Sequence, residues 1–307
     1  MGTGGTIAGT SAQAGDNIGY TAGQVGVAQL LDAVPGLQTM AGDLLIEQVA
    51  QIDSKDMDAE IWRALAQRCA HYLNAPEVRG IVITHGTDTL EETAWFLHEV
   101  LDAGKKPVVL TCSMRPSTAL TPDGPQNLLD AMAVAVAPGA RGVLAVAAGE
   151  VHGARHVQKV HPYRVHAFAS ADVGPLGFLE EGQVRLTKDW PLALDGKARI
   201  AIENIANMNV WPRVEIVMSH AGATGFMVDA LVRDGVQGLV VACTGNGTIH
   251  HHLEAALLRA QAAGVAVVRA TRCPEGQVLP KPGDPLPDSQ GLSPVKARIA
   301  LMLDLLR

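Results

Sequence analysis

Two short motifs in this chain combine glycine with threonine hydroxyls, a combination suited to a nucleophile held close to a substrate. The first motif, TGGTIAGT, begins at Thr3 and places Thr6 directly after Gly4 and Gly5. Glycine lets the backbone approach a ligand closely, and the threonine then presents its hydroxyl from a loop. A tight turn whose threonine caps a helix explains this motif equally well. A dinucleotide-binding loop fits less well, because no ribose-binding acid follows a second strand.

The second motif, THGTDTLEETA, begins at Thr84, at the end of the apolar run IVIT. It places Thr87 and Asp88 where a strand would give way to a helix. We expect one of the two to serve as the helix N-cap, which leaves the other to face a substrate. Asp88 can accept a hydrogen bond from a substrate ammonium and orient a lysine. A lysine that has lost its proton can activate Thr87.

The elements around both motifs indicate an open α/β sheet, in which ligands gather beyond the carboxyl ends of the strands. Apolar runs predict buried strands, and apolar residues at helical spacing predict helices between them. This alternation is typical of βαβ units and a parallel, flavodoxin-like or Rossmann-like sheet. The predicted strands span residues 44–52, 80–84, 107–111 and 142–148, and the predicted helices span 56–73 and 88–101.

The start of the chain departs from this pattern. One residue, Gly2, separates Met1 from the first motif, where an α/β protein normally has a complete strand. We therefore expect either that this strand is lost or that residues upstream of Met1 are missing.

A second alternating unit follows a stretch rich in Pro, Asn, Gly and charged residues. Its predicted strands span residues 214–218, 238–243 and 265–270, with helices over 224–233, 250–263 and 293–306. We therefore predict a large N-terminal domain over residues 1–186, a connector over 187–213, and a smaller C-terminal α/β domain over 214–307.

Composition excludes several classes of function. A net charge of −7 without a Lys/Arg cluster provides no basic surface that would bind nucleic acid or an anionic membrane. No apolar run approaches the roughly 18 residues of a membrane span, and no charged region precedes an apolar one at the start. We expect a cytoplasmic protein, or a periplasmic one if the true N-terminus is missing. Its partner is expected to be a small-molecule substrate.

A metal site is not expected either. The four cysteines are widely spaced, without paired CxxC motifs, so neither zinc nor a disulfide framework is indicated. The consecutive histidines at 250–252 point in different directions on a helix, which makes a poor metal site. His85 is expected to be structural.

At this point the chain resembles a known family. TGGTI followed about eighty residues later by HGTDTLEETA is similar to the two signature motifs of the bacterial L-asparaginases. IDSKDM, MRPSTALTPDGPQNLLDA and CTGNG continue the likeness in the order of that family. The resemblance implies hydrolysis of the side-chain amide of asparagine, and often of glutamine, through an acyl-enzyme and without a cofactor. It also implies a homotetramer built from intimate dimers.

The resemblance assigns roles to individual residues. Thr6 corresponds to the primary nucleophile on a mobile lid, and Tyr20 to the lid tyrosine that helps to activate it. Ser54 corresponds to the serine that holds the substrate α-carboxylate. The second threonine and its partners correspond to Thr87, Asp88 and Lys159. Backbone N–H groups beside the threonines, with Gly5 next to the substrate, would form an oxyanion hole.

Three departures from the family pattern affect the substrate site. Lys55 stands where relatives commonly have Gln or Glu near the substrate amino group. Thr248 stands where many have Asn or Ser from a neighbouring subunit. The loop over 274–291 is short, which leaves Glu275 and Asp284 as candidates for an acid that reaches across the dimer.

Other functions on the same fold stay open at this stage. These are a glutaminase, an amidotransferase-type subunit that releases ammonia, and a catalytically silent amino-acid-binding protein. The combination of Thr6, Thr87, Asp88 and Lys159 argues against a silent binder, which needs no pair of nucleophile candidates.

Overall fold

The computed structural model describes residues 1–13, 15–191, 200–208 and 210–307. The chain divides into two compact units, Met1–Ala206 and Asn207–Arg307. Part of the predicted connector, residues 192–199 and 209, lies outside the described residues. Helix α6 (Ile202–Ala206) belongs to the first unit.

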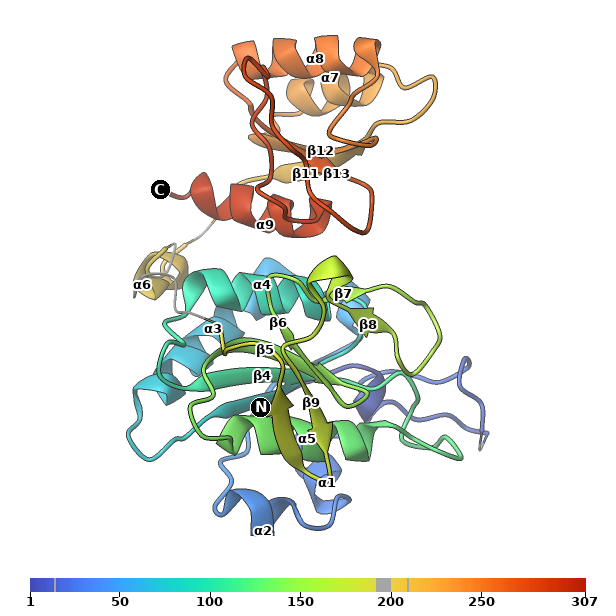
Figure 1. Ribbon diagram of the computed structural model, residues 1–307, viewed down its shortest axis with the longest axis vertical. Helices are drawn as coiled ribbons and strands as arrows, with labels where there is room; N and C mark the ends of the chain where they lie inside the picture. The colour runs from blue at the N-terminus through green and yellow to red at the C-terminus, as the bar shows by residue number, and fades with distance from the viewer. Residues whose placement is uncertain (14, 192–199, 209) are drawn as a thin grey trace. The chain divides into compact units, whose positions relative to one another are not determined.

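The first unit is built on an eight-stranded sheet with the order β10-β9-β6-β5-β4-β3-β1-β2 (Figure 1). Strands β2, β1, β3, β4 and β5 are mutually parallel, as the alternating pattern predicts. The bounds of these five are β1 Gly2–Gly4, β2 Gln48–Ile52, β3 Ile81–Thr84, β4 Pro107–Thr111 and β5 Gly142–Ala147.

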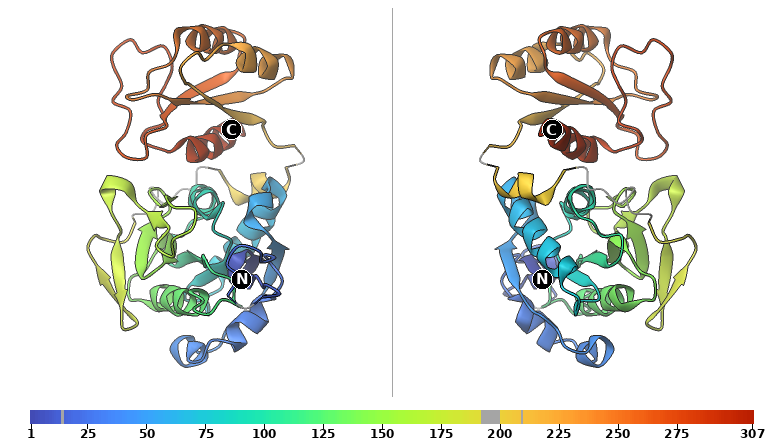
Figure 2. Two further views of the ribbon diagram at one scale, coloured as in Figure 1. Left: turned by 90° about the vertical axis from the view of Figure 1, so that its right-hand side faces the viewer. Right: turned by 90° about the vertical axis from the view of Figure 1, so that its left-hand side faces the viewer.

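Helices cover both faces of this sheet (Figures 1 and 2). Helices α3 (Ala59–Asn74) and α4 (Leu90–Val100) lie on one face, and α5 (Gly124–Val136) lies on the other. Trp62 of α3 stacks on Phe96 of α4 with ring centroids 5.0 Å apart, so the two helices share an aromatic contact. Two shorter helices, α1 (Val27–Asp32) and α2 (Leu37–Ala41), precede β2.

An antiparallel extension of the sheet was not predicted from the sequence. Strand β6 (Glu150–Gly153) pairs antiparallel with β5, and β9 (Gly177–Glu180) and β10 (Gln183–Leu186) follow. A separate two-stranded sheet joins β7 (Gln158–Lys159) to β8 (Phe168–Ala169). These strands have two to four residues each, too few for a periodic pattern to stand out.

The second unit is a smaller three-layer α/β domain. Its parallel sheet has the order β11-β12-β13, with bounds Val214–Met218, Gly238–Cys243 and Ala266–Thr271. Helices α7 (Phe226–Arg233) and α8 (His251–Ala262) cover one face, and α9 (Pro294–Asp304) covers the other (Figure 2). The predicted strands and helices of this region match these elements to within three residues at each end.

None of the helices in the described part of the chain is both long enough and apolar enough to cross a membrane.

Candidate active site

Two glycine loops meet at the carboxyl ends of β1 and β3. Gly4 and Gly5 have φ of 103° and 81°, a region that side chains disfavour. A Cβ on Gly5 would lie 2.2 Å from the Cα of Gly86, and the Gly5 N–H donates to the Ile52 carbonyl at 2.8 Å. The backbone segments preceding Thr6 and Thr87 therefore touch directly, which brings the two motifs together.

Thr6 begins a single 3-10 turn, Thr6–Ala8, that follows β1. Its hydroxyl lies 2.7 Å from the Tyr20 hydroxyl, and its side chain is buried. Tyr20 comes from a loop that returns to this turn, because Thr10 and Thr21 exchange two backbone hydrogen bonds. The loop therefore holds a phenol against the threonine hydroxyl.

Thr87, Asp88 and Lys159 form a second hydroxyl set. The Lys159 amine donates to Thr87 Oγ1 at 2.7 Å and to Asp88 Oδ1 at 2.6 Å. The Lys159 side chain is 17% exposed and that of Asp88 is 52% exposed. A lysine amine close to a hydroxyl and a carboxylate can polarise the hydroxyl while the carboxylate stays accessible to a cationic ligand.

The N-cap expectation for this motif was wrong. Helix α4 begins at Leu90 and its N-cap is Thr89, so neither Thr87 nor Asp88 has that position. The Thr89 hydroxyl donates instead to the Ser54 carbonyl at 2.7 Å. Because Thr89 is the N-cap, neither the Thr87 nor the Asp88 side chain caps the helix.

The Ser54 side chain lies against the glycine loop of the second motif. It begins the 3-10 turn Ser54–Asp56 after β2, and its hydroxyl oxygen accepts from the Asp88 backbone N–H at 3.2 Å. A Cβ on Gly86 would lie 2.4 Å from this oxygen. Since the oxygen accepts, the hydroxyl hydrogen of Ser54 can be donated to a ligand.

The hairpin of β7 and β8 delivers Lys159 to the site from 71 residues away in sequence. The Lys159 backbone N–H faces the carboxylate of Glu91 at 3.4 Å, in the first turn of α4. No role for Glu91 was predicted from the sequence. Its place in the quoted motif, four residues after Thr87, was the signal that could have indicated one.

A loop that holds the Thr6 segment was not predicted from the sequence either. Ser117 donates to the Gly9 carbonyl through both its N–H, at 3.0 Å, and its hydroxyl, at 2.8 Å. The Thr118 hydroxyl accepts from the Ser11 N–H at 2.9 Å. These residues belong to MRPSTALTPDG, which was quoted for its resemblance alone.

His85 is completely buried behind the second motif. Its Nδ1 lies 2.7 Å from the Gly86 carbonyl, which can only accept, so Nδ1 carries the hydrogen. Nε2 is buried without a hydrogen-bond partner among the described residues. Burial lowers the pKa of His85 to about 4, because the charged imidazolium would lose its hydration.

Lys55 turns toward neighbouring acids of its own turn. Its amine lies 2.6 Å from the Asp56 carboxylate and 3.6 Å from that of Asp53, and its side chain is 60% exposed. The Asp56 carboxylate is the main reason that the pKa of Lys55 is raised.

Thr248 and the candidate acids lie in the second unit. Thr248 exchanges backbone and hydroxyl hydrogen bonds with Thr244, which closes a tight loop. Asp284 binds the buried Arg269 at 2.7 Å, and that guanidinium also donates to the Gly247 carbonyl at 3.3 Å. Asp284 thus braces the loop that carries Thr248, while Glu275 is exposed.

Across the residues that the structure describes, no group of three or more His, Cys, Asp or Glu side chains is placed to hold a metal ion.

Two sequence profiles of known protein families match this chain. The sequence profile described as "Asparaginase, N-terminal" matches residues 1–192, and "Glutaminase/Asparaginase C-terminal domain" matches residues 213–307. The chain belongs to the asparaginase family. L-asparaginase 2 of Bacillus subtilis (strain 168) is 38% identical to this family member, over 99% of this chain and 81% of its own length.

Two further relatives agree with this membership. Glutaminase-asparaginase of Pseudomonas fluorescens biotype A is 36% identical over 99% of this asparaginase-family chain and 85% of its own length. The solved structure of a probable cytoplasmic L-asparaginase from Campylobacter jejuni superposes with a TM-score of 0.93 and 38% identity. The match covers 100% of this chain and 94% of that structure. The family, and with it the fold, was therefore predicted correctly from the motifs.

Proposed function

We propose that this chain is an L-asparaginase, which hydrolyses the side-chain amide of L-asparagine to L-aspartate and ammonia through a threonine ester. The observation that carries the proposal is the pair of hydroxyl sets at one edge of the sheet. Thr6 contacts Tyr20 at 2.7 Å, and Thr87 contacts Lys159 at 2.7 Å. Relatives named L-asparaginase or glutaminase-asparaginase over nearly the whole chain support the choice of substrate.

The substrate is held by its α-amino and α-carboxylate groups. Asp88, half exposed beside Lys159, accepts from the α-ammonium. Ser54 donates its hydroxyl hydrogen to the α-carboxylate, since its oxygen already accepts from the Asp88 N–H. Thr248 stays a further substrate contact, whereas Lys55, which was also predicted to contact the substrate, binds Asp56 at the surface and is left out.

The first chemical step forms the ester. The Thr6 oxygen attacks the amide carbon, and its proton passes through the Tyr20 hydroxyl to the amide nitrogen. The new C–O bond forms, the C–N bond breaks, and ammonia leaves. Backbone N–H groups at Gly5 and beside the threonines stabilise the negative charge that develops on the carbonyl oxygen.

The second step hydrolyses the ester. Water attacks the ester carbon, and its proton passes through the Thr87 hydroxyl and the Lys159 amine to the Asp88 carboxylate. The ester C–O bond then breaks, and the proton returns to the Thr6 oxygen. L-Aspartate leaves and both threonines are restored, with no cofactor taking part.

The assembly is also part of the proposal. We propose residues 1–186 as the catalytic domain, 187–213 as a connector, and 214–307 as a domain that completes a neighbouring subunit's site through Thr248. The family resemblance implies a homotetramer of intimate dimers, and we include that assembly in the proposal. The cytoplasm is the proposed compartment, supported by the solved relative described as cytoplasmic.

The test is ammonia release by the purified protein from L-asparagine and L-glutamine. Thr6→Ala and Thr87→Ala should each lower kcat by about a thousandfold or more, with unchanged circular dichroism. Thr6→Ser, which keeps a hydroxyl, is the matched control and should retain measurable turnover. A folded protein that releases no ammonia from either amide would overturn the proposal. A Thr6→Ala variant with near wild-type kcat would remove Thr6 from the mechanism.

A further inference from the structure

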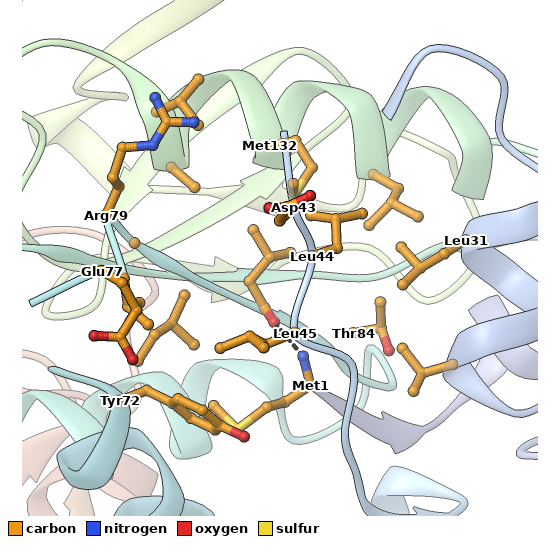
Figure 3. Close-up of a pocket in the computed structure, with 18 residues that line it drawn as sticks. Met1, Leu31, Asp43, Leu44, Leu45, Tyr72, Glu77, Arg79, Thr84 and Met132 are labelled. Carbon is orange, nitrogen blue, oxygen red and sulfur yellow. Dashed lines mark hydrogen bonds between the residues drawn. The ribbon is translucent and has the colours of Figure 1, made fainter. Parts of the chain in front are cut away.

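Two features of the first unit have no part in the proposed mechanism. One is a cavity of about 550 Å³ beside the amino ends of β2 and β3, which Figure 3 shows. Its lining is mainly apolar, and neither Thr6 nor Thr87 contributes to it. The other is a cluster of polar side chains on β6, which contacts the hairpin of β7 and β8. Only the second feature touches an element of the candidate active site.

Lys159 comes from a hairpin that is too short to hold itself in place. Strands β7 and β8 have two residues each and pair only with each other, with Lys159 opposite Phe168. An isolated two-stranded hairpin is at best marginally stable in water. The position of Lys159 therefore depends on contacts between the hairpin and the rest of the first unit.

Strand β6 presents two polar side chains to the hairpin. Successive side chains of a strand point to opposite faces of the sheet, so Glu150 and His152 share one face. Val151 points to the other face, where it packs in the core beside α5. The His152 side chain is almost fully buried on its own face, where a polar group needs a hydrogen-bond partner.

The partner of His152 is Ser170, the residue that follows β8. Ser170 Oγ lies 2.9 Å from His152 Nδ1, and both side chains are buried. Ser170 is the N-cap of a 3-10 turn, yet its side chain makes no capping bond and contacts His152 instead. On the other side of the ring, Nε2 lies 3.4 Å from the Glu150 carboxylate. This carboxylate favours a hydrogen on Nε2, which leaves Nδ1 to accept from the Ser170 hydroxyl.

Glu150 extends the cluster to the other end of β8. Its carboxylate lies 3.1 Å from Nε2 of His166, which belongs to the loop before β8. The His166 side chain is exposed, so this pair contributes less than the buried bond to Ser170. Strand β8 is thus held before and after its two residues. Phe168, the ladder partner of Lys159, lies between the two contacts.

The backbone after β8 shows that this segment is held against a local preference. Ala171 has φ of 45°, a left-handed conformation that alanine adopts only at a cost in free energy. Such a residue persists only where the surrounding contacts fix it. The bond between His152 and Ser170 is one of these contacts, because Ser170 directly precedes Ala171.

A second hydrolytic site does not account for this cluster. Serine, histidine and glutamate are also the components of a hydrolase triad. However, Ser170 is 2% exposed and His152 is 1% exposed, so no substrate carbonyl reaches the serine hydroxyl. The cluster therefore acts on the hairpin and not on a substrate of its own.

We propose that His152 is a positioning residue for Lys159 and acts through its hydrogen bond to Ser170. The bond fixes the end of β8, β8 pairs with β7, and the Lys159 amine stays 2.7 Å from the Thr87 hydroxyl. This role rests on the proposed function, in which Lys159 takes part in hydrolysis of the ester. Without the bond the hairpin opens more often, so the ester is hydrolysed more slowly, while the attack by Thr6 is unchanged.

The test compares changes on the two faces of β6. His152→Leu removes both ring nitrogens, and Ser170→Ala removes the hydroxyl with a smaller change in volume. His152→Asn keeps a polar atom at the place of Nδ1 and is the rescue variant. Val151→Ala is the matched control, because it removes buried apolar volume beside α5 but no side-chain contact to the hairpin.

Hydrogen exchange measures the hairpin without reference to catalysis. The Val160 N–H donates to the Ala167 carbonyl at 2.8 Å, so its exchange reports opening of the hairpin. The Gly142 N–H, at the start of β5, donates to the Ala103 carbonyl at 2.8 Å and reports opening of the main sheet. The ratio of the two exchange rates separates movement of the hairpin from a general loss of stability.

We expect His152→Leu and Ser170→Ala to speed exchange at Val160 by at least about tenfold relative to Gly142. His152→Asn should restore most of the protection, and Val151→Ala should leave the ratio unchanged. An unchanged ratio in both His152→Leu and Ser170→Ala would overturn the proposal. Ser170→Ala decides the matter by itself if the leucine variant does not fold.

The time course of ammonia release tests the link to Lys159. When hydrolysis of the ester becomes the slow step, one ammonia per site appears in a fast phase before steady turnover. We expect this burst in His152→Leu and Ser170→Ala, with kcat lowered by at least about tenfold and kcat/KM within about twofold of wild type. Val151→Ala should keep the wild-type kcat and show no new burst.

Two results of the kinetic experiment would overturn the proposed role. A lower kcat/KM without a burst would place the defect in formation of the ester, and a wild-type kcat with a mobile hairpin would separate His152 from catalysis. If wild type releases no ammonia from either amide, the proposed function fails. Hydrogen exchange then decides by itself whether His152 fixes the hairpin.

Discussion

The buried histidine behind the second motif makes stability depend on pH in a way that can be calculated. His85 is fully buried, its Nδ1 hydrogen is used by the Gly86 carbonyl, and burial lowers its pKa to about 4. An exposed histidine in an unfolded chain has a pKa of about 6.5. Between these two values the unfolded chain binds a proton that the folded protein does not accept.

The sign follows from this difference. Because the unfolded state holds more protons, the free energy of unfolding falls as the pH is lowered from about 6.5 to about 4. The contribution is fully present above pH 6.5. A difference of about 2.5 between the folded and unfolded pKa values corresponds to about 3 kcal/mol in the free energy of unfolding. This is a substantial part of the stability of a domain.

The perturbation is His85→Asn, whose amide nitrogen can keep the bond to the Gly86 carbonyl. Urea unfolding of wild type and variant is measured from pH 7.5 to pH 4. The variant should be less stable than wild type at pH 7.5, and the gap should narrow by about 3 kcal/mol by pH 4. His71→Asn, at an exposed position on α3, is the control and should leave the pH slope unchanged. A gap that stays constant over this pH range would refute the reasoning.

Three further outcomes are expected. Gly5→Ala should reduce activity more than a hundredfold and lower stability by more than about 4 kcal/mol, because its Cβ would overlap the Gly86 backbone. Gly36→Ala has a similar φ and open space around it, so it should cost only about 1 to 2 kcal/mol; equal costs would contradict the backbone contact. Lys55→Gln should change KM for asparagine by less than about twofold, since the amine binds Asp56 at the surface; a tenfold fall in KM would place it on the substrate. Ammonia release should disappear when sedimentation shows monomers and should fall in Thr248→Ala; a fully active monomer would exclude Thr248 from the site.

Sequence patterns predicted the parallel strands because buried parallel strands are continuous apolar runs. The run at 107–111 coincides with β4, and that at 142–148 exceeds β5 by one residue. The run at 44–52 exceeded β2 by four residues, because the pairing of β2 with β1 begins at Gln48, opposite Gly2. The strands of two to four residues after β5 carry no periodicity, so the hairpin that delivers Lys159 was missed.

Contacts between distant loops were beyond sequence reasoning for a different reason. The Thr6 and Tyr20 positions were assigned by resemblance, but nothing in the spacing says that Gly5 and Gly86 touch through backbone atoms. That contact depends on β1 lying beside β3, which is a property of strand order. The N-cap error arose in the same way, because the choice of Thr89 depends on the Ser54 carbonyl from another loop.

The position of β1 inside the sheet has a consequence for the order of folding. Met1 bonds to Val82, 81 residues away, and Gly2 bonds to Glu47 on the other side. Strands β3, β4 and β5 find each other over shorter loops, which close at a lower entropic cost. We therefore expect β1 to dock late, between neighbours that are already formed. Thr6 follows directly on that strand, so we expect the Thr6 turn to reach its final position only after β2 and β3 have formed.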